Sequence, residues 1–197
     1  MINDTNKLIL TDCDGVLLNW EYAFDVWMND KGYSLGLHTQ LMYDSDERYG
    51  IPRDKSKELI KFFNESASMG FIPPLRDAVQ YVRKLHEEYG YTLGVITSLS
   101  TNPYAVKLRE RNLEKLFGSA IAFVKCLETG ADKHEALLPY KDSGIVWIED
   151  KVENAEVGNN LGLRSILVEH GHNMEHNNPD IPIVKGWKEI YEMMKDS

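Results

Sequence analysis

The chain alternates between two patterns of apolar positions, one typical of strands and the other of helices. Short apolar runs that predict buried strands occupy 7–10, 92–97, 120–124, 144–148 and 164–168. Apolar residues at helical spacing predict helices over 75–90, 103–118, 132–140, 151–162 and 186–195. Strands that alternate with helices in this way predict an α/β protein with a doubly wound parallel sheet.

Residues 19–73 interrupt this alternation directly after the first strand. One helix is predicted from Trp20, where apolar residues share one face, and a second over 52–71, whereas 33–51 carries no clear pattern. A plain connection would need only a few residues and a helix. The excess predicts a small α-helical cap inserted after the first strand. The expected domains are an α/β core over 1–18 and 74–197 and the helical cap over 19–73.

Composition and charge exclude some classes of function. With 197 residues, of which 43% are hydrophobic and 27% charged, the chain fits one globular domain with an insert. Its net charge of −9 argues against a nucleic-acid polymer as partner, because binding to a phosphate backbone needs a basic surface. A basic group interleaved with glutamates is interpreted as a solvated helix face: Lys107, Arg109, Arg111 and Lys115.

The sequence shows no sign of a membrane segment or of an oxidising compartment. No apolar run approaches the ~20 residues of a membrane span. The first residues have no signal-peptide pattern, and two cysteines give no disulfide framework. We therefore expect a cytoplasmic protein, a monomer or a homodimer, that does not act on membranes.

Two aspartates follow the first strand in the stretch LILTDCDGVL. If the extended geometry continues, Asp12 and Asp14 face the same small volume, where their carboxylates repel unless a cation lies between them. A turn or a helix N-cap before Gly15 would need only one aspartate. The pair therefore favours a metal site or a catalytic site, and Cys13 between them is interpreted as a small buried spacer.

Further polar residues stand where later strands end. Thr97 and Ser98 follow the second strand, and Glu149 and Asp150 follow the fourth. A parallel sheet places its ligands outside the carboxyl ends of the strands. A turn or a helix cap would explain each of these residues alone, but their shared position at one edge favours a site.

Carboxylates, a hydroxyl and a lysine at one edge suit the hydrolysis of a phosphate monoester with Mg²⁺. Mg²⁺ takes hard oxygen ligands, which Asp12, Asp14 and Asp150 offer. At its ordinary pKa of about 3.9, Asp12 is expected to be an ionised nucleophile at pH 7. Thr97 can hydrogen-bond a phosphoryl oxygen, and Lys133 can neutralise charge there. Asp14 can pass a proton to the leaving group and then take one from water.

Four stretches in order, DCDGVL, VITS, DK before a short helix, and WIEDKVEN, resemble the four motifs of the haloacid dehalogenase superfamily. The resemblance covers nearly the whole chain. It implies a Mg²⁺-dependent phosphatase in which Asp12 becomes an aspartyl phosphate and Asp14 is the acid–base residue. It further implies that Thr97 binds the phosphate, that Lys133 is the lysine of the third motif, and that Asp150 binds the metal.

Two motifs depart from the family pattern. The fourth has Glu149 before Asp150, where another aspartate or a glycine is commoner, so both acids are candidates for the metal; Asp150 is ranked first, with Glu149 and Asn154 supporting it. The third offers two lysines. Lys125 directly follows a strand, but Lys133 opens a helix in the way that is usual in the family and is ranked first.

The resemblance fixes the reaction better than the substrate. Dehalogenases of the family lack the second aspartate, so Asp14 argues against that activity. The stretch DCDGVLLNWE, followed by an aromatic helix, is similar to 5′(3′)-deoxyribonucleotidases and implies a nucleoside monophosphate as substrate. Ser98 would then bind the substrate as well, and Trp20 and Tyr43 would stack on its base. Most aromatic residues of 19–73 are expected to pack the core of the cap itself.

Other interpretations stay open. The substrate can be a sugar phosphate or another small phosphorylated metabolite. A phosphorylation receiver, or a non-catalytic binding module, would also gather acids, a hydroxyl and a lysine around Mg²⁺. Receivers are shorter, have no cap and carry the phosphorylated aspartate on a middle strand. The stretch EHGHNMEH is interpreted as a polar loop at the rim of the site rather than as a zinc centre.

Overall fold

Six parallel strands form one sheet at the centre of the protein. The structure is a computed structural model that describes residues 7–39 and 42–195. The strand order is β3-β2-β1-β4-β5-β6. The strands are β1 (Leu8–Thr11), β2 (Thr92–Thr97), β3 (Ile121–Cys126), β4 (Val146–Glu149), β5 (Arg164–Val168) and β6 (Ile183–Val184). The predicted parallel sheet is confirmed. β6 has no counterpart in the prediction, because two residues are too few to form a pattern.

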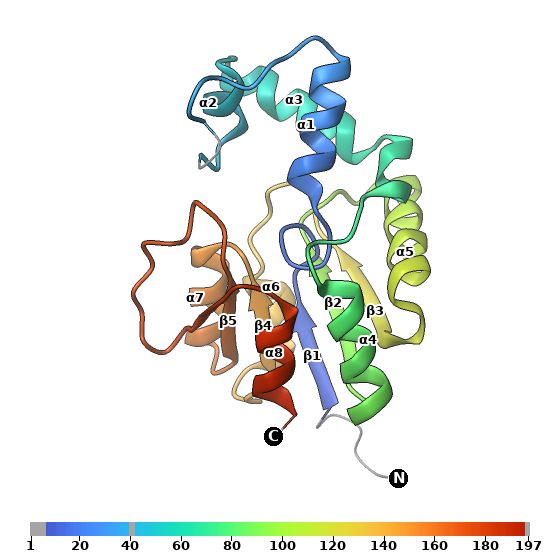
Figure 1. The fold of residues 1–197 in the computed structure, drawn as a ribbon, viewed down its shortest axis with the longest axis vertical. Coiled ribbons are helices and arrows are strands. Elements are labelled where there is room, and N and C mark those ends of the chain that lie inside the picture. Colours follow the sequence, from blue (N-terminus) through green and yellow to red (C-terminus); the bar gives the residue numbers. More distant parts are fainter. Residues whose placement is uncertain (1–6, 40–41, 196–197) are drawn as a thin grey trace.

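Helices cover both faces of this sheet (Figure 1). They are α4 (Ala78–Tyr89), α5 (Pro103–Phe117), α6 (His134–Leu137), α7 (Val152–Asn160) and α8 (Trp187–Met194). Residues of α4, α5 and α8 share a buried cluster with Ile9, whereas α6 shares another with Leu10 and Trp147. Successive residues of β1 thus face opposite layers, and the central strand is buried on both sides. Within the described part of the chain, no helix is long and apolar enough to span a membrane.

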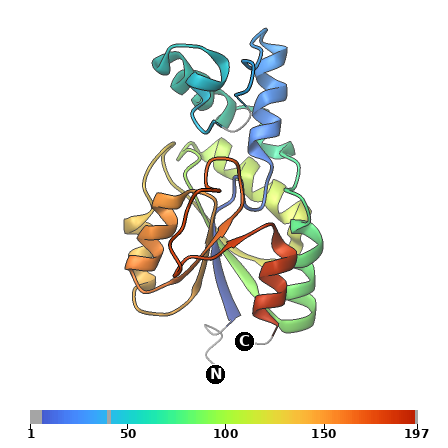
Figure 2. The same ribbon diagram turned by 60° about the vertical axis from the view of Figure 1, so that its left-hand side comes forward.

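A second group of helices stands beyond the carboxyl ends of the strands (Figures 1 and 2). It consists of α1 (Trp20–Asp30), α2 (Ser45–Tyr49), α3 (Arg53–Asn64) and the 3-10 helix η2 (Ala67–Phe71). The helix predicted over 52–71 is therefore two elements, because the Ser66 hydroxyl accepts a hydrogen bond from the Ser68 amide and starts the new turn. We call residues 19–73 the helical segment; that it acts as a cap stays a prediction.

Aromatic side chains form the core of the helical segment. Phe24 stacks on Trp20 with ring centroids 4.7 Å apart and meets Phe63 edge to face at 5.3 Å. Trp27 and Tyr49 pack against the same cluster. These residues hold the segment together as expected, whereas four other aromatic residues of the segment are exposed: Tyr22, Tyr43, Phe62 and Phe71.

Two stretches of chain join the helical segment to the sheet and run side by side. The Asn19 amide donates to the Pro73 carbonyl at 2.8 Å. Asn64 of α3 accepts a hydrogen bond from the Trp20 indole at 2.9 Å and donates to the Leu99 carbonyl at 3.1 Å. These contacts fix the position of the segment over the carboxyl edge of the sheet.

The close contact of α7 with β4 yields a prediction about stability. A Cβ atom at Gly158 would lie 2.4 Å from Cδ1 of Trp147 and 2.7 Å from Oγ of Ser165, and both of these residues are buried. We expect Gly158→Ala to lower the free energy of unfolding by about 1–3 kcal/mol, although alanine favours a helix by about 1 kcal/mol. Urea denaturation measures the change. Glu156→Ala, at an exposed position of the same helix, is the control; equal stability of the two variants would contradict the packing argument.

Candidate active site

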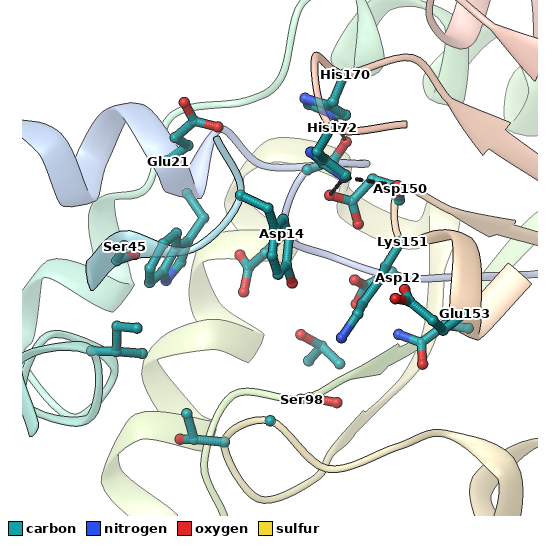
Figure 3. Close-up of a pocket in the computed structure, with 18 of the residues that line it drawn as sticks. Asp12, Asp14, Glu21, Ser45, Ser98, Asp150, Lys151, Glu153, His170 and His172 are labelled. Atoms are coloured by element: carbon teal, nitrogen blue, oxygen red, sulfur yellow. Dashed lines mark hydrogen bonds and ion pairs between the residues drawn. The ribbon is translucent and has the colours of Figure 1, made fainter. Parts of the chain in front are cut away.

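A cavity of about 430 Å³ lies between the carboxyl edge of the sheet and the helical segment. The sheet side contributes most of the residues predicted from the sequence: Asp12, Asp14, Thr97, Ser98, Lys133 and Asp150. The helical segment contributes Trp20, Glu21, Tyr43, Ser45 and Arg48. In Figure 3, Glu21 and Ser45 lie on one side, Asp150 and Lys151 on the other, and Asp14 between them. The strand ends and the segment thus converge on one space, as the sequence predicts.

Lys133 joins two carboxylates at the base of this cavity. Its Nζ lies 2.7 Å from Oδ1 of Asp12 and 2.6 Å from Oε1 of Glu149, and only 1% of its side chain is exposed. Lys125, the other lysine considered from the sequence, is exposed on the edge strand β3 and does not line the cavity. The geometry therefore favours Lys133 over Lys125.

Glu149 is held by four donors, which leaves it little room for a metal. Its Oε1 accepts hydrogen bonds from Lys133 and from Asn154 Nδ2, the latter at 2.8 Å. Its Oε2 accepts from the backbone amides of Asp150 and Lys151, both at 2.8 Å. The support expected from Asn154 is thus given to Glu149, and Glu149 in turn orients Lys133.

The buried charges shift one another's pKa values. Burial raises the pKa of Asp12 to about 7, against the effect of Lys133 and with that of Glu149. Burial and the neighbouring carboxylates of Glu149 and Asp12 raise the pKa of Asp150 well above its usual range. Burial alone would raise the pKa of Glu149, but Lys133 and the hydrogen bonds outweigh it and the pKa is lowered. The expectation that Asp12 has an ordinary pKa is therefore wrong when only the groups of the protein act on it, because burial raises its pKa.

The acids at this edge fit a divalent cation. Carboxylate oxygens of Asp12, Glu149 and Asp150 lie within 4.8 Å of one another, and in the described part of the chain they form the one cluster of this kind. Oxygen ligands of this type suit Mg²⁺. Asp12 and Asp150 are the better candidates, because the oxygens of Glu149 already accept four hydrogen bonds.

Thr97 and Ser98 differ in what their hydroxyls do. The Thr97 hydroxyl is fully buried beside the cavity and has no hydrogen-bond partner among the described residues. A buried polar group without a partner is costly, so a ligand oxygen is a fitting acceptor or donor for it. Ser98 Oγ donates to the Ala131 carbonyl at 2.7 Å. Its hydroxyl therefore helps to hold the loop before Lys133.

Arg109 corrects one interpretation of the sequence. The sequence predicts a solvated basic face here, but the side chain of Arg109 is fully buried and forms an ion pair with Asp14. Its neighbours Lys107 and Arg111 are exposed, as expected. Spacing carries the signal that would have found it, because Arg109 lies four residues from both Ala105 and Leu113, which are buried on the same face.

The histidine loop after β5 lies at the rim of the cavity. His170 Nε2 donates to the Gly15 carbonyl at 2.7 Å, and His172 Nε2 donates to the Asp150 carbonyl at 3.0 Å. Burial lowers the pKa of His170 to about 4, so this ring is neutral at pH 7. Gly15 has φ +77°, and a Cβ there would lie 2.3 Å from Oδ2 of Asp150. The loop thus holds backbone around the acids, in agreement with a rim rather than a zinc centre.

Trp20 and Tyr43 reach the cavity from the helical segment with different freedom. Trp20 is fixed by its stack on Phe24 and by the hydrogen bond to Asn64. Tyr43 is 53% exposed, and its ring lies 4.8 Å from that of His172 in an edge-to-face contact. Lys151 Nζ also lies over the Tyr43 ring, 5.5 Å from its centroid. Tyr43 as a whole is the more exposed of the two residues.

Solved structures show that the chain has the haloacid dehalogenase-like α/β fold. CbbY from Rhodobacter sphaeroides in complex with phosphate matches with TM-score 0.60 and 17% identity, over 93% of this chain and 96% of that one. L-2-haloacid dehalogenase from Xanthobacter autotrophicus matches with TM-score 0.59 and 10% identity, over 96% and 98%. D,D-heptose 1,7-bisphosphate phosphatase from Burkholderia thailandensis matches with TM-score 0.56 and 10% identity, over 97% and 99%. The neighbours include phosphatases and dehalogenases, so they show the fold and not the reaction.

Sequence comparison adds a viral relative. The chain is 27% identical over 157 residues to an uncharacterised 32.4 kDa protein of the Gp30-rIII intergenic region of Enterobacteria phage T4. The match covers 75% of this chain and 55% of the phage protein, so the chain spans about half the length of that relative. No protein-family model matches the chain.

The position of Lys133 predicts a large effect on stability. Lys133→Met would leave Asp12 and Glu149 buried without their cation, and removing one partner of a buried ion pair costs about 3–5 kcal/mol. We expect a loss of this size in urea denaturation, and a partial recovery in Lys133→Met/Glu149→Gln. Lys125→Met, which changes an exposed lysine, is the matched control and should stay within about 0.5 kcal/mol of the wild type. A similar loss in both single variants would argue against the buried cluster.

Proposed function

We propose that this protein is a Mg²⁺-dependent phosphatase that hydrolyses small phosphate monoesters through an aspartyl phosphate on Asp12. The observation that carries the proposal is the base of the cavity. There, Asp12 lies beside Lys133 and near Asp150. The buried hydroxyl of Thr97 has no hydrogen-bond partner among the described residues. A nucleophile, a cation, a metal-binding acid and a free hydrogen-bonding group are the requirements of phosphoryl transfer.

The second aspartate favours a phosphatase over a dehalogenase. Asp14 lines the same cavity as Asp12 and is 24% exposed, so its carboxylate is accessible to a bound molecule. In the proposed reaction, an oxygen of Asp12 attacks phosphorus, and the bond from phosphorus to the leaving oxygen breaks as Asp14 gives that oxygen a proton. Water then attacks the aspartyl phosphate and loses a proton to Asp14, which releases phosphate and restores the Asp12 carboxylate and the protonated form of Asp14.

The other residues of the site stabilise charge during these steps. Lys133 lies close enough to Asp12 to offset charge on the oxygens of the phosphoryl group. The Thr97 hydroxyl donates to one of these oxygens. Asp12 and Asp150 would hold Mg²⁺, which would supply Lewis-acid neutralisation of the phosphate charge. A bound cation would also lower the pKa of Asp12 from its raised value of about 7.

A nucleoside monophosphate is the proposed class of substrate. The cavity of about 430 Å³ falls within the ~300–1,000 Å³ of small-molecule sites. Its far side comes from the helical segment, where Tyr43 presents an exposed ring and Trp20 another aromatic wall. Stacking on an aromatic ring suits any nucleobase, because every base has a π face. The helical segment then acts as the cap that selects the leaving group.

Loss of the nucleophile or of the metal should stop turnover. We expect Asp12→Asn to reduce phosphate release to background with every substrate of a panel of phosphorylated metabolites, while the melting curve stays near that of the wild type. We expect EDTA to abolish the wild-type activity and Mg²⁺ to restore it. Asp54→Asn, an exposed aspartate of α3, is the control variant. Substantial turnover in Asp12→Asn, or full activity after EDTA treatment, would refute the mechanism.

Tyr43 provides the sharper test of the nucleotide. Trp20→Ala would also disturb the core of the helical segment, whereas Tyr43 is half exposed. We expect Tyr43→Ala to weaken kcat/KM for a deoxynucleoside monophosphate by about 1–3 kcal/mol and to change it little for acetyl phosphate, which has no base. Tyr22→Ala, an exposed tyrosine of α1 outside the cavity, is the matched control. Equal losses on the two substrates would exclude a stacking role.

A further inference from the structure

A buried arginine forms a bidentate ion pair with the second aspartate of the site. Arg109 of α5 donates from Nη1 to Oδ1 of Asp14 at 2.5 Å and from Nη2 to Oδ2 at 3.0 Å. The arginine side chain is 0% exposed, and among the described residues Asp14 is its one carboxylate partner. A bidentate contact of this kind fixes both the direction and the plane of a carboxylate.

The guanidinium group also contacts the loop after β1 and the 3-10 helix η2, and a neighbouring residue of α5 holds the helix in place. Nη1 also contacts Sγ of Cys13 at 2.8 Å, and Nη2 contacts Sδ of Met69 in η2 at 3.4 Å. One turn further along α5, Asn112 Nδ2 donates to the Ile72 carbonyl at 2.9 Å. Arg109 therefore cannot shift without disturbing the loop after β1 or the point where the helical segment returns to the core.

The two partners differ in their exposure, and this separates the contact from an ordinary structural ion pair. Arg109 is sealed, whereas Asp14 is 24% exposed and lines the cavity. The arginine thus holds the carboxylate from behind and leaves its other side open to a bound molecule. Burying an unpaired guanidinium would be costly, so Asp14 is also constrained to stay in this place.

We propose that Arg109 is a positioning residue that orients Asp14 for proton transfer to the leaving group. This inference rests on the proposed phosphatase function. Arg109 exchanges no proton itself. Asp14 gives its proton to the leaving oxygen as the bond to phosphorus breaks, and it takes one from the attacking water in the second step. Without this ion pair, the Asp14 carboxylate would sample other rotamers and would lie near the leaving oxygen less often.

Substrates that differ in their leaving group provide the test. The leaving group of a deoxynucleoside monophosphate or of glycerol phosphate is an alkoxide and needs a proton, whereas acetyl phosphate releases a carboxylate, which does not. A positioned proton donor contributes ~10²–10⁴-fold. We therefore expect Arg109→Met to lose about tenfold or more of kcat/KM with the alkyl phosphates and clearly less with acetyl phosphate.

Two further variants separate charge from geometry. Arg109→Lys keeps the positive charge but lacks the bidentate donor. Its kcat/KM with alkyl phosphates should therefore lie between those of the wild type and of Arg109→Met. Arg111→Met changes an exposed arginine of the same helix and is the matched control, with kcat/KM like that of the wild type. Equal losses of Arg109→Met on both kinds of substrate would overturn the proposal.

A double variant tests whether Arg109 acts through Asp14. If it does, Asp14→Asn/Arg109→Met should be no slower with alkyl phosphates than Asp14→Asn alone. A further loss that multiplies the first would show that Arg109 acts elsewhere, and would overturn the proposal. The double variant also removes both charges of the pair, so its fold is not burdened by an unpaired buried ion.

A structural measurement keeps the inference separate from the proposed function. Crystal structures of the wild type and of Arg109→Met should show the Asp14 side chain turned to another rotamer or spread over several in the variant. An Asp14 that keeps its place without Arg109 would overturn the positioning role, whatever the activity. A wild type that hydrolyses neither kind of substrate would refute the proposed phosphatase function. A displaced Asp14 in Arg109→Met would even then support the inference that Arg109 positions this side chain.

Discussion

A lysine buried between two carboxylates is the contact on which the rest of the site depends. Lys133 comes from the start of α6, Asp12 from the end of β1 and Glu149 from the end of β4. Removing such groups from water costs several kcal/mol per ion, and only close partners of opposite charge offset it. The cluster therefore joins two central strands and a helix at one point, and it fixes Asp12 facing the cavity. The same contacts that hold the edge of the sheet together also prepare the nucleophile of the proposed reaction.

The sequence predicts those parts of the structure that follow from the order of the strands. Parallel strands end at one edge, so residues that directly follow apolar runs come together however the rest of the chain folds. Asp12, Thr97 and Asp150 were found in this way, and the structure brings them to one cavity. The choice between Lys125 and Lys133 depends on a loop after β3, and the residues alone left it to the resemblance with a known family. In the folded chain, the ammonium group of Lys133 lies between the acids.

The parts that the sequence does not predict are contacts between distant elements. Arg109 and Asp14 are 95 positions apart, and no pattern in the sequence around either residue predicts that the two are partners. Charges lie all round α5, and the helical spacing of Arg109 from the apolar residues Ala105 and Leu113 is the sign that it points inward. The sequence leaves open whether Glu149 or Asp150 binds the metal, because both follow the same strand; the four donors to Glu149 come from residues whose geometry is set by the fold. Polar residues on an apolar face therefore carry information that charge counts conceal.

The balance of charge explains why the site needs more than its own residues. The clustered groups are four carboxylates and two cations: Asp12, Asp14, Glu149 and Asp150 with Lys133 and Arg109. They leave a formal charge of −2, and burial of this excess is why the pKa values of Asp12 and Asp150 are raised. A phosphate dianion would be repelled by such a site. A divalent cation cancels the excess and a monovalent one does not, so the charge of the protein groups itself supports Mg²⁺ in the proposed function. In the proposed function, such a cation would lower the raised pKa of Asp12 as well as offset the charge of the substrate.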